Sequence, residues 1–231
     1  MQIKKPYLGI IGGSGIYDLD NISNVKWLNI SSKFGKPSDK ILTGIINDIN
    51  IAFLPRHGKS HNLLPSNINY RANIDCLKSL GVTDIISLSA VGSLKENIKP
   101  GDFVIIDQFI DRTFARSKTF FNDGIVAHVS MAKPTSENLR NIIFESAPDN
   151  INILNGGIYI AMEGPQFSTL AESNLYRSWN CDVIGMTNMP EAKLAREAEI
   201  AYATIAMVTD YDCWHPDHDA VTVDSIIKVL N

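Results

Sequence analysis

Hydroxyl, imidazole and guanidinium groups follow several apolar runs of this chain. In the segments GGSG, FLPRHGKSH, ISLSAVGS and IGMTN these groups belong to Ser14, Arg56, His57, Ser89 and Thr187. Each can donate a hydrogen bond to a tetrahedral oxyanion, and arginine adds a planar, permanently charged fork that can bind in a bidentate manner. Such residues after successive strand-like runs predict a binding site for a small anion such as phosphate.

Two aspartates and an aromatic ring supply complementary chemistry. Asp210 and Asp212 lie in VTDYDCW, and Phe167 lies in EGPQFST. Carboxylates accept hydrogen bonds, or donate one when protonated, and they repel an anion. They must therefore contact a different, neutral or cationic part of the ligand, where Phe167 offers a stacking surface. The combination predicts a ligand site for phosphate together with a heterocyclic base.

The glycine-rich turn of YLGIIGGSGIYDLD differs in spacing from two common phosphate motifs. The dinucleotide motif needs a third glycine where this chain has Asp18, whose carboxylate would repel a pyrophosphate. The nucleoside triphosphate motif needs a lysine, and none follows Gly15. What remains is a short turn of backbone N–H groups around Ser14, which suits a small anion. A tight turn without a ligand is the alternative interpretation.

Continuous apolar, β-branched runs predict the strands that would position these groups. Such runs are typical of strands buried on both faces of a sheet. We expect strands at residues 8–11, 51–54, 84–88, 103–106, 158–162, 183–186 and 203–208. Ligands of open α/β sheets bind beyond the carboxyl ends of strands, so the polar residues that follow these runs should converge.

Amphipathic stretches between these runs predict helices. Ser66, Thr135 and Ser168 can each cap the first turn of one helix, and Pro190 suits the first turn of a fourth. Strands that alternate with helices indicate an α/β sheet that is at least partly parallel. With no internal repeat or linker, the 231 residues predict one domain with a sizeable core.

Composition and charge limit the remaining possibilities. The formal net charge of -4 gives no basic field for nucleic acid or an anionic membrane, so any anion site must be built locally. Cys76, Cys181 and Cys213 are widely spaced and form no C-x-x-C pair. This spacing argues against a structural zinc site and favours a protein of a reducing compartment. No apolar run is long enough to span a bilayer, and the N-terminus does not resemble a signal peptide. We expect a cytoplasmic protein that binds neither nucleic acid nor membrane.

Long segments of the chain resemble the trimeric 5′-methylthioadenosine phosphorylases, a branch of the purine nucleoside phosphorylase superfamily. The resemblance is carried by GIIGGSGIYD, PRHGKSHNLLPSNINYRANI, SAVGSLKENIKPGDFVIIDQFIDRT, MEGPQFSTLAES and TDYDCWHPDHDAVTVD. It implies an α/β fold with a twisted mixed β-sheet flanked by helices, and a homotrimer. It also implies that phosphate cleaves methylthioadenosine to adenine and 5-methylthioribose 1-phosphate, in purine and methionine salvage, with no metal or organic cofactor.

The resemblance also implies roles for individual residues. Those expected to hold phosphate are Ser14, Arg56, His57, Ser89, Ala90 and Thr187. Those expected around the nucleoside are Phe167, Ser168, Met186, Asp210, Tyr211, Asp212, Val223 and Ile226. His128 resembles a residue that family members lend to the site of a neighbouring subunit. Ser14 and Ser89 stand where close relatives often have threonine, a difference that keeps the hydroxyl.

Asp210, Asp212 and His57 are the residues we expect to take part in catalysis. A leaving adenine needs a proton at N7, and Asp210 is the candidate donor if burial beside Asp212 raises its pKa. Related phosphorylases for 6-oxopurines carry Asn at the position of Asp210 and Glu at that of Ser168. A carboxylate accepts from a 6-amino group, whereas an amide can donate to O6. The difference predicts a preference for adenine.

Three alternatives stay open on the sequence alone. One is a phosphorylase for methylthioinosine or another purine nucleoside. A second is a nucleosidase that uses water, against which the number of anion donors argues. The third is a non-catalytic nucleoside-binding protein, because family members continue with a helical segment that helps close the site. We expect residues 1–231 to form a single phosphorylase domain without that segment. His215 and His218 are separated by a proline and form no regular ligand pair, so we expect no metal.

Overall fold

One mixed β-sheet forms the centre of the molecule. The structure is a computed structural model, and it describes residues 6–12, 22–121 and 124–217. Within these residues the 11 strands of the sheet are β1 (Tyr7–Gly12), β2 (Ser23–Leu28), β3 (Ile41–Ile46), β4 (Ile49–Pro55), β5 (Asp84–Ser93), β6 (Phe103–Ile106), β7 (Gln108–Asp111), β8 (Ile153–Asn155), β9 (Ile158–Ala161), β10 (Val183–Gly185) and β11 (Ala201–Asp210). The α/β fold predicted from the sequence is confirmed.

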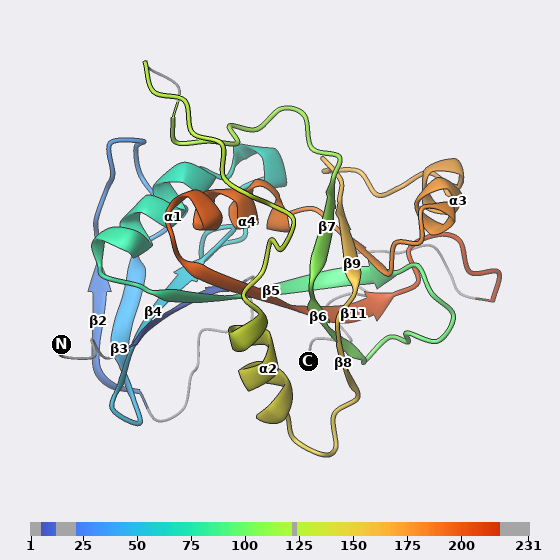
Figure 1. The fold of residues 1–231 in the computed structure, drawn as a ribbon, viewed down its shortest axis with the longest axis horizontal. Coiled ribbons are helices and arrows are strands. Elements are labelled where there is room, and N and C mark those ends of the chain that lie inside the picture. Colours follow the sequence, from blue (N-terminus) through green and yellow to red (C-terminus); the bar gives the residue numbers. More distant parts are fainter. Residues whose placement is uncertain (1–5, 13–21, 122–123, 218–231) are drawn as a thin grey trace.

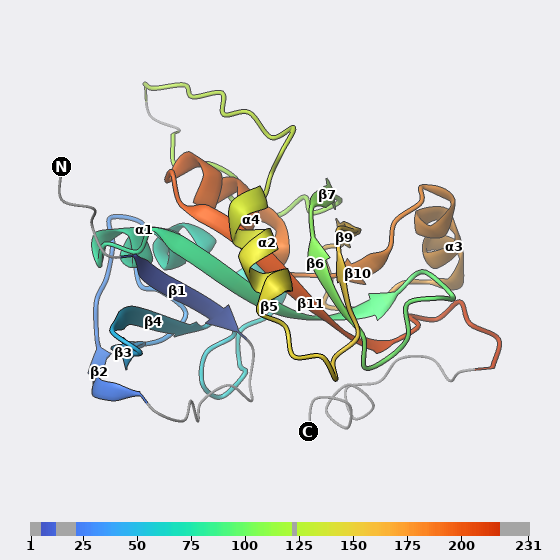
Figure 2. The same ribbon diagram turned by 60° about the horizontal axis from the view of Figure 1, so that its bottom comes forward.

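Helices flank this sheet. In the described part of the chain they are η1 (Pro65–Asn67), α1 (Tyr70–Ser79), α2 (Glu137–Glu145), α3 (Leu170–Ser178) and α4 (Asn188–Glu197). Figures 1 and 2 show α1 and α4 side by side along β5 and β11, and α3 at the far end beyond β9 and β10. α2 packs on β6, β8 and β11. No helix of the described residues is long and apolar enough to cross a bilayer.

β5 is the strand around which the sheet is organised. β1 runs parallel to its first half, from Leu8 opposite Asp84 to Ile11 opposite Ser87. β10 runs antiparallel to its second half, with Ile184 opposite Gly92. β11 runs parallel to nearly its whole length. The sheet is therefore partly parallel, as the alternation of strands and helices predicts.

All seven predicted strands are present, with ends that differ by a few residues. The sequence patterns do not predict β2, β3, β7 and β8. β2 is exposed along nearly its whole length, so it lacks a buried apolar run. β7 and β8 contain only 4 and 3 residues. Short or exposed strands are formed through their partners rather than through a local pattern.

Ser89 and Ala90 lie within β5 rather than after it, so the predicted end of this strand at residue 88 is wrong. β11 stays paired with β5 as far as Gly92, and this pairing carries the strand past the serine. The polar groups of Ser89 therefore project from the middle of a strand.

The helices begin slightly later than the predicted caps. The N-cap residues are Asn69, Ser136 and Thr169, and the side chain of each accepts a hydrogen bond from a backbone N–H in the first turn. Ser66, a predicted cap, instead lies in η1 and donates to the Glu163 carboxylate. An N-cap is defined by the hydrogen bond between its side chain and a backbone N–H of the first turn. The sequence does not show which of several neighbouring serines and threonines makes that bond.

A buried ion pair joins the centre of the sheet to α4. Arg56, directly after β4, donates from Nε and Nη2 to the two carboxylate oxygens of Glu191 at 2.8 and 3.1 Å. The two side chains are 2% and 1% exposed. Ser87 of β5 and Tyr202 of β11 donate to the same Glu191 oxygen at 2.7 and 2.8 Å. A charge pair this deep is tolerated because its donors and acceptors are paired, and here β4, β5, β11 and α4 all supply partners.

We expect Glu191→Ala to destabilise the fold by about 3–5 kcal/mol, because it leaves the Arg56 guanidinium buried without its counter-ion. The measurement is urea unfolding at one protomer concentration. Lys133→Ala is the control: the Lys133–Glu137 pair is 83% and 66% exposed. Exposed pairs of this i,i+4 type contribute only about 0.3–0.5 kcal/mol. Similar small losses in both variants would contradict a structural role for the Arg56–Glu191 pair.

Candidate functional site

An opening in the pairing of β5 lies at the centre of the candidate site. The first residues of β5 pair with both β1 and β11, and Gly92 pairs with both β10 and β11. β1 and β10 therefore share one side of β5. Among the described residues, no strand pairs with residues 88–91 on that side. A ligand can approach strand backbone only where no neighbouring strand covers it.

Ser89 and Thr187 lie close together at this opening. Ile184 is opposite Gly92, and Thr187 follows three residues later, between β10 and α4. The Tyr159 hydroxyl lies 3.2 Å from Ser89 Oγ and 3.5 Å from Thr187 N, so both residues adjoin the same atom. The antiparallel direction of β10 thus brings together two hydroxyl residues that the sequence predicts for phosphate.

Arg56 lies beside the opening and uses most of its donors on protein partners. Nε and Nη2 bind Glu191, and Nη2 also donates to Ser87 Oγ at 2.6 Å. Nη1 carries two hydrogens, and its only acceptor among the described residues is the Leu88 carbonyl at 2.9 Å. In this conformation Arg56 offers an anion one N–H, rather than the bidentate fork expected from the sequence.

His57 is neutral, and the position of its proton follows from its neighbour. Nδ1 lies 2.8 Å from the Leu63 carbonyl, which can only accept, so Nδ1 carries the hydrogen. Nε2 is then left with its lone pair. Burial lowers the pKa of His57 to about 4, and the charge of Arg56 adds to the effect. Near neutral pH the imidazole therefore presents an acceptor at Nε2.

Asp210 and Asp212 lie at the end of β11, beside Gly92 of β5. Asp210 accepts from Thr209 Oγ1 at 2.7 Å and from Asp212 N at 2.8 Å. Burial raises the pKa of Asp210 to about 6, and Asp212 contributes to the rise. Burial raises the pKa of Asp212 as well. A Cβ atom at Gly92 would lie 2.8 Å from Asp210 Oδ1, so this close approach requires glycine.

Ser168 adjoins Asp212, the second of these aspartates. The Cys213 thiol donates to the Ser168 carbonyl at 3.4 Å and lies 3.9 Å from Asp212 Oδ2. Phe167, the residue before Ser168, is 40% exposed, so its ring has a face open to a ligand. The EGPQFST loop and the end of β11 are thereby placed together, as their predicted roles require.

The ring of Tyr211 lies away from solvent in an apolar cluster. It is 6% exposed and meets the Trp214 ring edge-on, with centroids 5.7 Å apart. Tyr211 is therefore a packing residue through its side chain, and only its backbone lies between the two aspartates.

Arg116 and Glu163 hold the turn that carries Met186. Arg116 Nη1 donates to the carbonyls of Met186 and Met189 at 2.5 and 2.6 Å, and its Nε lies 3.3 Å from Glu163 Oε1. Glu163 also accepts from Phe114 N at 2.6 Å. This ion pair joins the end of β9, the loop after β7 and the turn after β10. The Glu163 carboxylate is thus occupied by contacts within the fold.

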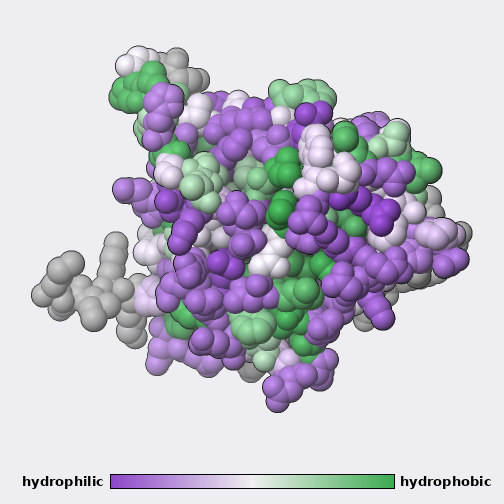
Figure 3. Space-filling view, turned by 45° about the vertical axis from the view of Figure 1, so that its right-hand side comes forward, coloured by the Kyte–Doolittle hydropathy of each residue, from purple (hydrophilic) through white to green (hydrophobic). Residues whose placement is uncertain are grey.

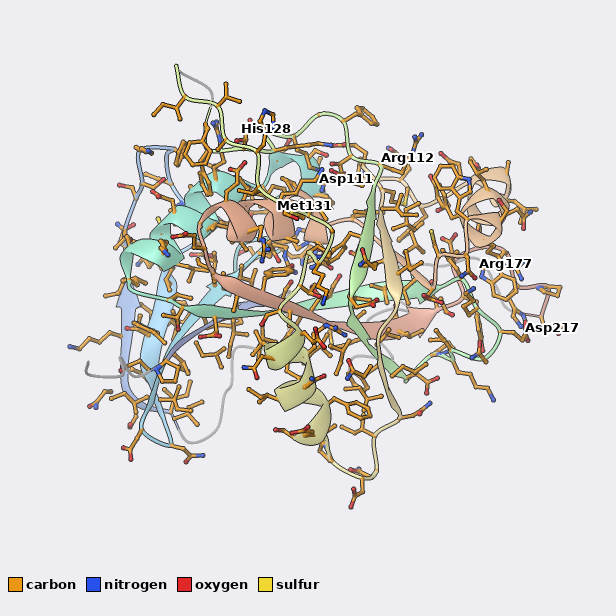
Figure 4. All side chains as sticks on the ribbon, in the orientation of Figure 1. Asp111, Arg112, His128, Met131, Arg177 and Asp217 are labelled. Atoms are coloured by element: carbon orange, nitrogen blue, oxygen red, sulfur yellow. The ribbon has the colours of Figure 1, made fainter. Side chains whose placement is uncertain are left out.

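The structure does not describe three of the predicted residues, and it places a fourth apart from this cluster. Ser14, Val223 and Ile226 lie outside the described residues. His128 is exposed on the loop between β7 and α2. Figure 4 shows it where this loop projects beyond α1 and α4, apart from the end of β11. Within one chain, His128 therefore does not reach the other candidate residues.

Sequence reasoning missed three buried polar residues of this region: Glu191, Tyr159 and Arg116. Glu191 had a detectable signal, since it is an acid among the buried residues Ala192, Leu194 and Ala195 of α4. Tyr159 and Arg116 gave none, because a tyrosine in an apolar strand and an arginine in a loop are both common. Among the described residues, no group of three His, Cys, Asp or Glu side chains is arranged to hold a metal ion.

Comparisons with known proteins identify the family of the chain. A model of the family described as "Phosphorylase superfamily" matches residues 7–229. The S-methyl-5'-thioadenosine phosphorylase of Rhodospirillum rubrum is 63% identical over 228 residues, which are 98% of this chain and 78% of the relative. A methylthioadenosine phosphorylase structure from an antarctic soil metagenomic library is 50% identical, with a TM-score of 0.89 over 98% of this chain and 82% of that one.

A third relative has a bound ligand. The methylthioadenosine phosphorylase of Schistosoma mansoni in complex with adenine is 38% identical, with a TM-score of 0.91 over 98% of this chain and 86% of that one. These matches extend over nearly the whole chain, through the strands and loops that carry the candidate residues. The chain belongs to the phosphorylase superfamily, within its group of methylthioadenosine phosphorylases.

Proposed function

We propose that this protein catalyses the phosphorolysis of S-methyl-5′-thioadenosine by inorganic phosphate. The observation that carries the proposal is the arrangement along β5, where Ser89 lies beside anion donors and Gly92 lies beside Asp210. Three residues of strand span roughly 10 Å, enough to separate a phosphate at one end from a purine at the other. The names of the relatives and the adenine in the Schistosoma mansoni complex support the same substrate class.

The reaction exchanges one bond at the sugar for another. The bond between C1′ and N9 of adenine breaks with its electron pair going to the base, and a phosphate oxygen bonds to C1′. The base takes up a proton at N7 and leaves as adenine, with 5-methylthioribose 1-phosphate as the other product. Phosphate beside the sugar stabilises the positive charge that develops there. In this proposal its donors are Ser14, Arg56, Ser89, Ala90 and Thr187.

His57 binds phosphate as an acceptor. Hydrogen phosphate carries one O–H group, and the lone pair of Nε2 can take a hydrogen bond from it. This contact directs the charged oxygens toward the hydroxyl and N–H donors and toward the sugar. A cationic His57 would instead donate a hydrogen bond to phosphate. The low pKa of His57 disfavours this protonated form near neutral pH.

Asp210 supplies the proton for N7, and Asp212 assists it. A carboxyl group with a pKa of about 6 holds its proton far more readily near neutral pH than an ordinary aspartate does. After the proton has moved, the Asp210 carboxylate accepts from the 6-amino group of adenine. The other nucleoside contacts that we propose involve Phe167 and Ser168 at the base, Met186 at the ribose, Val223 and Ile226 at the 5′ group, and the backbone of Tyr211.

We also propose a homotrimer in which His128 reaches the site of a neighbouring subunit. The support is apolar surface on two elements: Phe114 and Val126 are 81% and 79% exposed on the loop that carries His128, and Leu170 is 56% exposed at the start of α3. Figure 3 shows hydrophobic patches between hydrophilic ones on the side of the molecule that carries α3. Contiguous exposed apolar patches are typical of interfaces. Sedimentation equilibrium tests the assembly, and a stable, active monomer refutes it.

The proposed reaction needs phosphate as co-substrate and neither a metal nor an organic cofactor. Activity that survives exhaustive chelation tests this point. We further propose one phosphorylase domain that acts in purine and methionine salvage in the cytoplasm. The free thiols of Cys76, Cys181 and Cys213 support a reducing compartment, which cell fractionation tests.

We expect adenine release from methylthioadenosine to require phosphate, to rise with its concentration and to saturate. The measurement is adenine formation over a phosphate titration, with identification of the sugar product as the 1-phosphate. An identical titration with sulfate is the control for ionic strength. Release that is independent of phosphate would identify a nucleosidase instead, and binding without release would identify a nucleoside-binding protein.

We expect Asp210→Asn to shift the preference from methylthioadenosine toward inosine. The amide donates to O6 but cannot give a proton to N7, so kcat/KM on methylthioadenosine falls steeply. The ratio of the two kcat/KM values should move by at least about tenfold, since sites built on hydrogen bonds discriminate by orders of magnitude. Both nucleosides are assayed with both proteins at saturating phosphate. An unchanged ratio would remove the main physical support for adenine recognition by Asp210.

We expect kcat/KM for methylthioadenosine to fall as pH rises through about 6. The protonated form of Asp210 is the acid, its pKa is raised to about 6, and kcat/KM reports ionisations of the free enzyme. Phosphate is kept saturating at every pH, so that changes in its binding do not limit the rate. The residual activity of Asp210→Asn should lack this alkaline limb. The same limb in both proteins would assign it to another group.

A further inference from the structure

We infer that Tyr159 is a positioning residue for the phosphate site, whose hydroxyl orients the Ser89 hydroxyl toward the bound anion. The inference rests on the proposed function and assigns a role to a residue that sequence reasoning did not single out. Tyr159 lies in β9, and its ring packs against Phe109 with centroids 5.7 Å apart. Its side chain is 0% exposed, so solvent does not reach its hydroxyl.

The direction of each hydrogen bond follows from what its atoms can do. Thr187 N can only donate, so its N–H points to the Tyr159 oxygen at 3.5 Å. A buried O–H must itself donate to an acceptor. The Tyr159 hydroxyl adjoins the side chains of both Thr187 and Ser89, and in this inference it donates to Ser89 Oγ at 3.2 Å. The result is an ordered chain from Thr187 N–H through Tyr159 O–H to Ser89 Oγ.

This chain leaves the hydrogen of Ser89 directed elsewhere. Among the described residues its only acceptor is the carbonyl of Ala90, at a long distance of 3.4 Å. That weak contact is readily exchanged for a phosphate oxygen at the opening of β5. Since Tyr159 already occupies one lone pair of Ser89 Oγ, the serine is held as a donor before the anion arrives. Such orientation reduces the entropy lost on binding.

Tyr159 reaches this position because residue 185 has no side chain. A Cβ atom at Gly185 would lie 2.0 Å from the Tyr159 oxygen and 2.6 Å from Cζ. The ring therefore passes under β10 in space that any other residue at position 185 would fill. Burial raises the pKa of Tyr159, which keeps the hydroxyl protonated and able to donate.

Tyr159→Phe tests the inference, because it keeps the ring and removes the hydroxyl. The expected result is a rise of about three- to tenfold in KM for phosphate, the effect of losing one neutral hydrogen bond, with KM for methylthioadenosine changed less than about twofold. Calorimetric titration of inorganic phosphate into the same proteins should show a matching rise in Kd. Tyr7→Phe is the control: it removes the hydroxyl of another tyrosine, at the start of β1 and away from the opening, and should leave both values near those of the unaltered protein.

A double-mutant cycle with Ser89→Ala identifies the atom through which Tyr159 acts. If the hydroxyl works through Ser89, Tyr159→Phe should have no further effect on phosphate binding once Ser89 is alanine. Additive effects of the two changes overturn the inference. So does an unchanged phosphate KM in folded Tyr159→Phe, and so does an equal rise in both KM values. If Tyr159→Phe does not fold, Ser89→Ala alone tests the inference. An unchanged phosphate KM in Ser89→Ala overturns it, because Tyr159 is inferred to act through Ser89.

The calorimetric measurement separates this inference from the proposed function. If the unaltered protein releases no adenine but binds phosphate, the proposed reaction fails while the effect of Tyr159→Phe on phosphate Kd still decides the role of Tyr159. If the protein is active and the variant binds phosphate normally, only the inference fails.

Discussion

The buried ion pair between Arg56 and Glu191 is the constraint on which the site depends. It draws the end of β4 onto α4 and, through Ser87 and Tyr202, onto β5 and β11. A guanidinium is stable at 2% exposure only because Glu191 cancels its charge and binds its fork. The same pairing limits what Arg56 can offer a ligand, because it leaves only one N–H, on Nη1, without an acceptor among the described residues. Arg56 is thus mainly a structural residue placed at the edge of the site.

The strand β5 sets the spacing of the site because three strands share its two sides. β11 occupies one side throughout, while β1 and β10 divide the other and leave residues 88–91 uncovered by any described strand. Ser89 lies in this opening, and Gly92 lies where Asp210 meets the strand. The distance between the anion donors and the carboxylates is therefore fixed by strand rise rather than by loop conformation. A site built on a strand keeps its geometry better than one built on loops alone.

The sequence predicts the local parts of this arrangement better than the long-range ones. Asp210 at the end of β11 and Arg56 directly after β4 are found because apolar runs mark where those strands end. Ser89 is misplaced because pairing with β11, not local composition, carries β5 as far as Gly92. The direction of β10 has no local signal in three residues, yet it decides that Thr187 meets Ser89. Likewise, nothing near Arg56 in the sequence points to a partner 135 residues away.

The cationic groups beside the opening share a property that bears on phosphate selection: neither offers an unbalanced positive charge. Glu191 balances Arg56, and burial keeps His57 neutral near pH 7. With a net charge of -4 on the whole chain, no long-range field draws an anion to this place. Affinity for phosphate must then come from short contacts to hydroxyls and N–H groups whose directions are set in advance. In such a site, the groups that orient the donors matter as much as the donors themselves. A misdirected hydroxyl loses its hydrogen bond to phosphate, and no unbalanced positive charge nearby makes up for that loss.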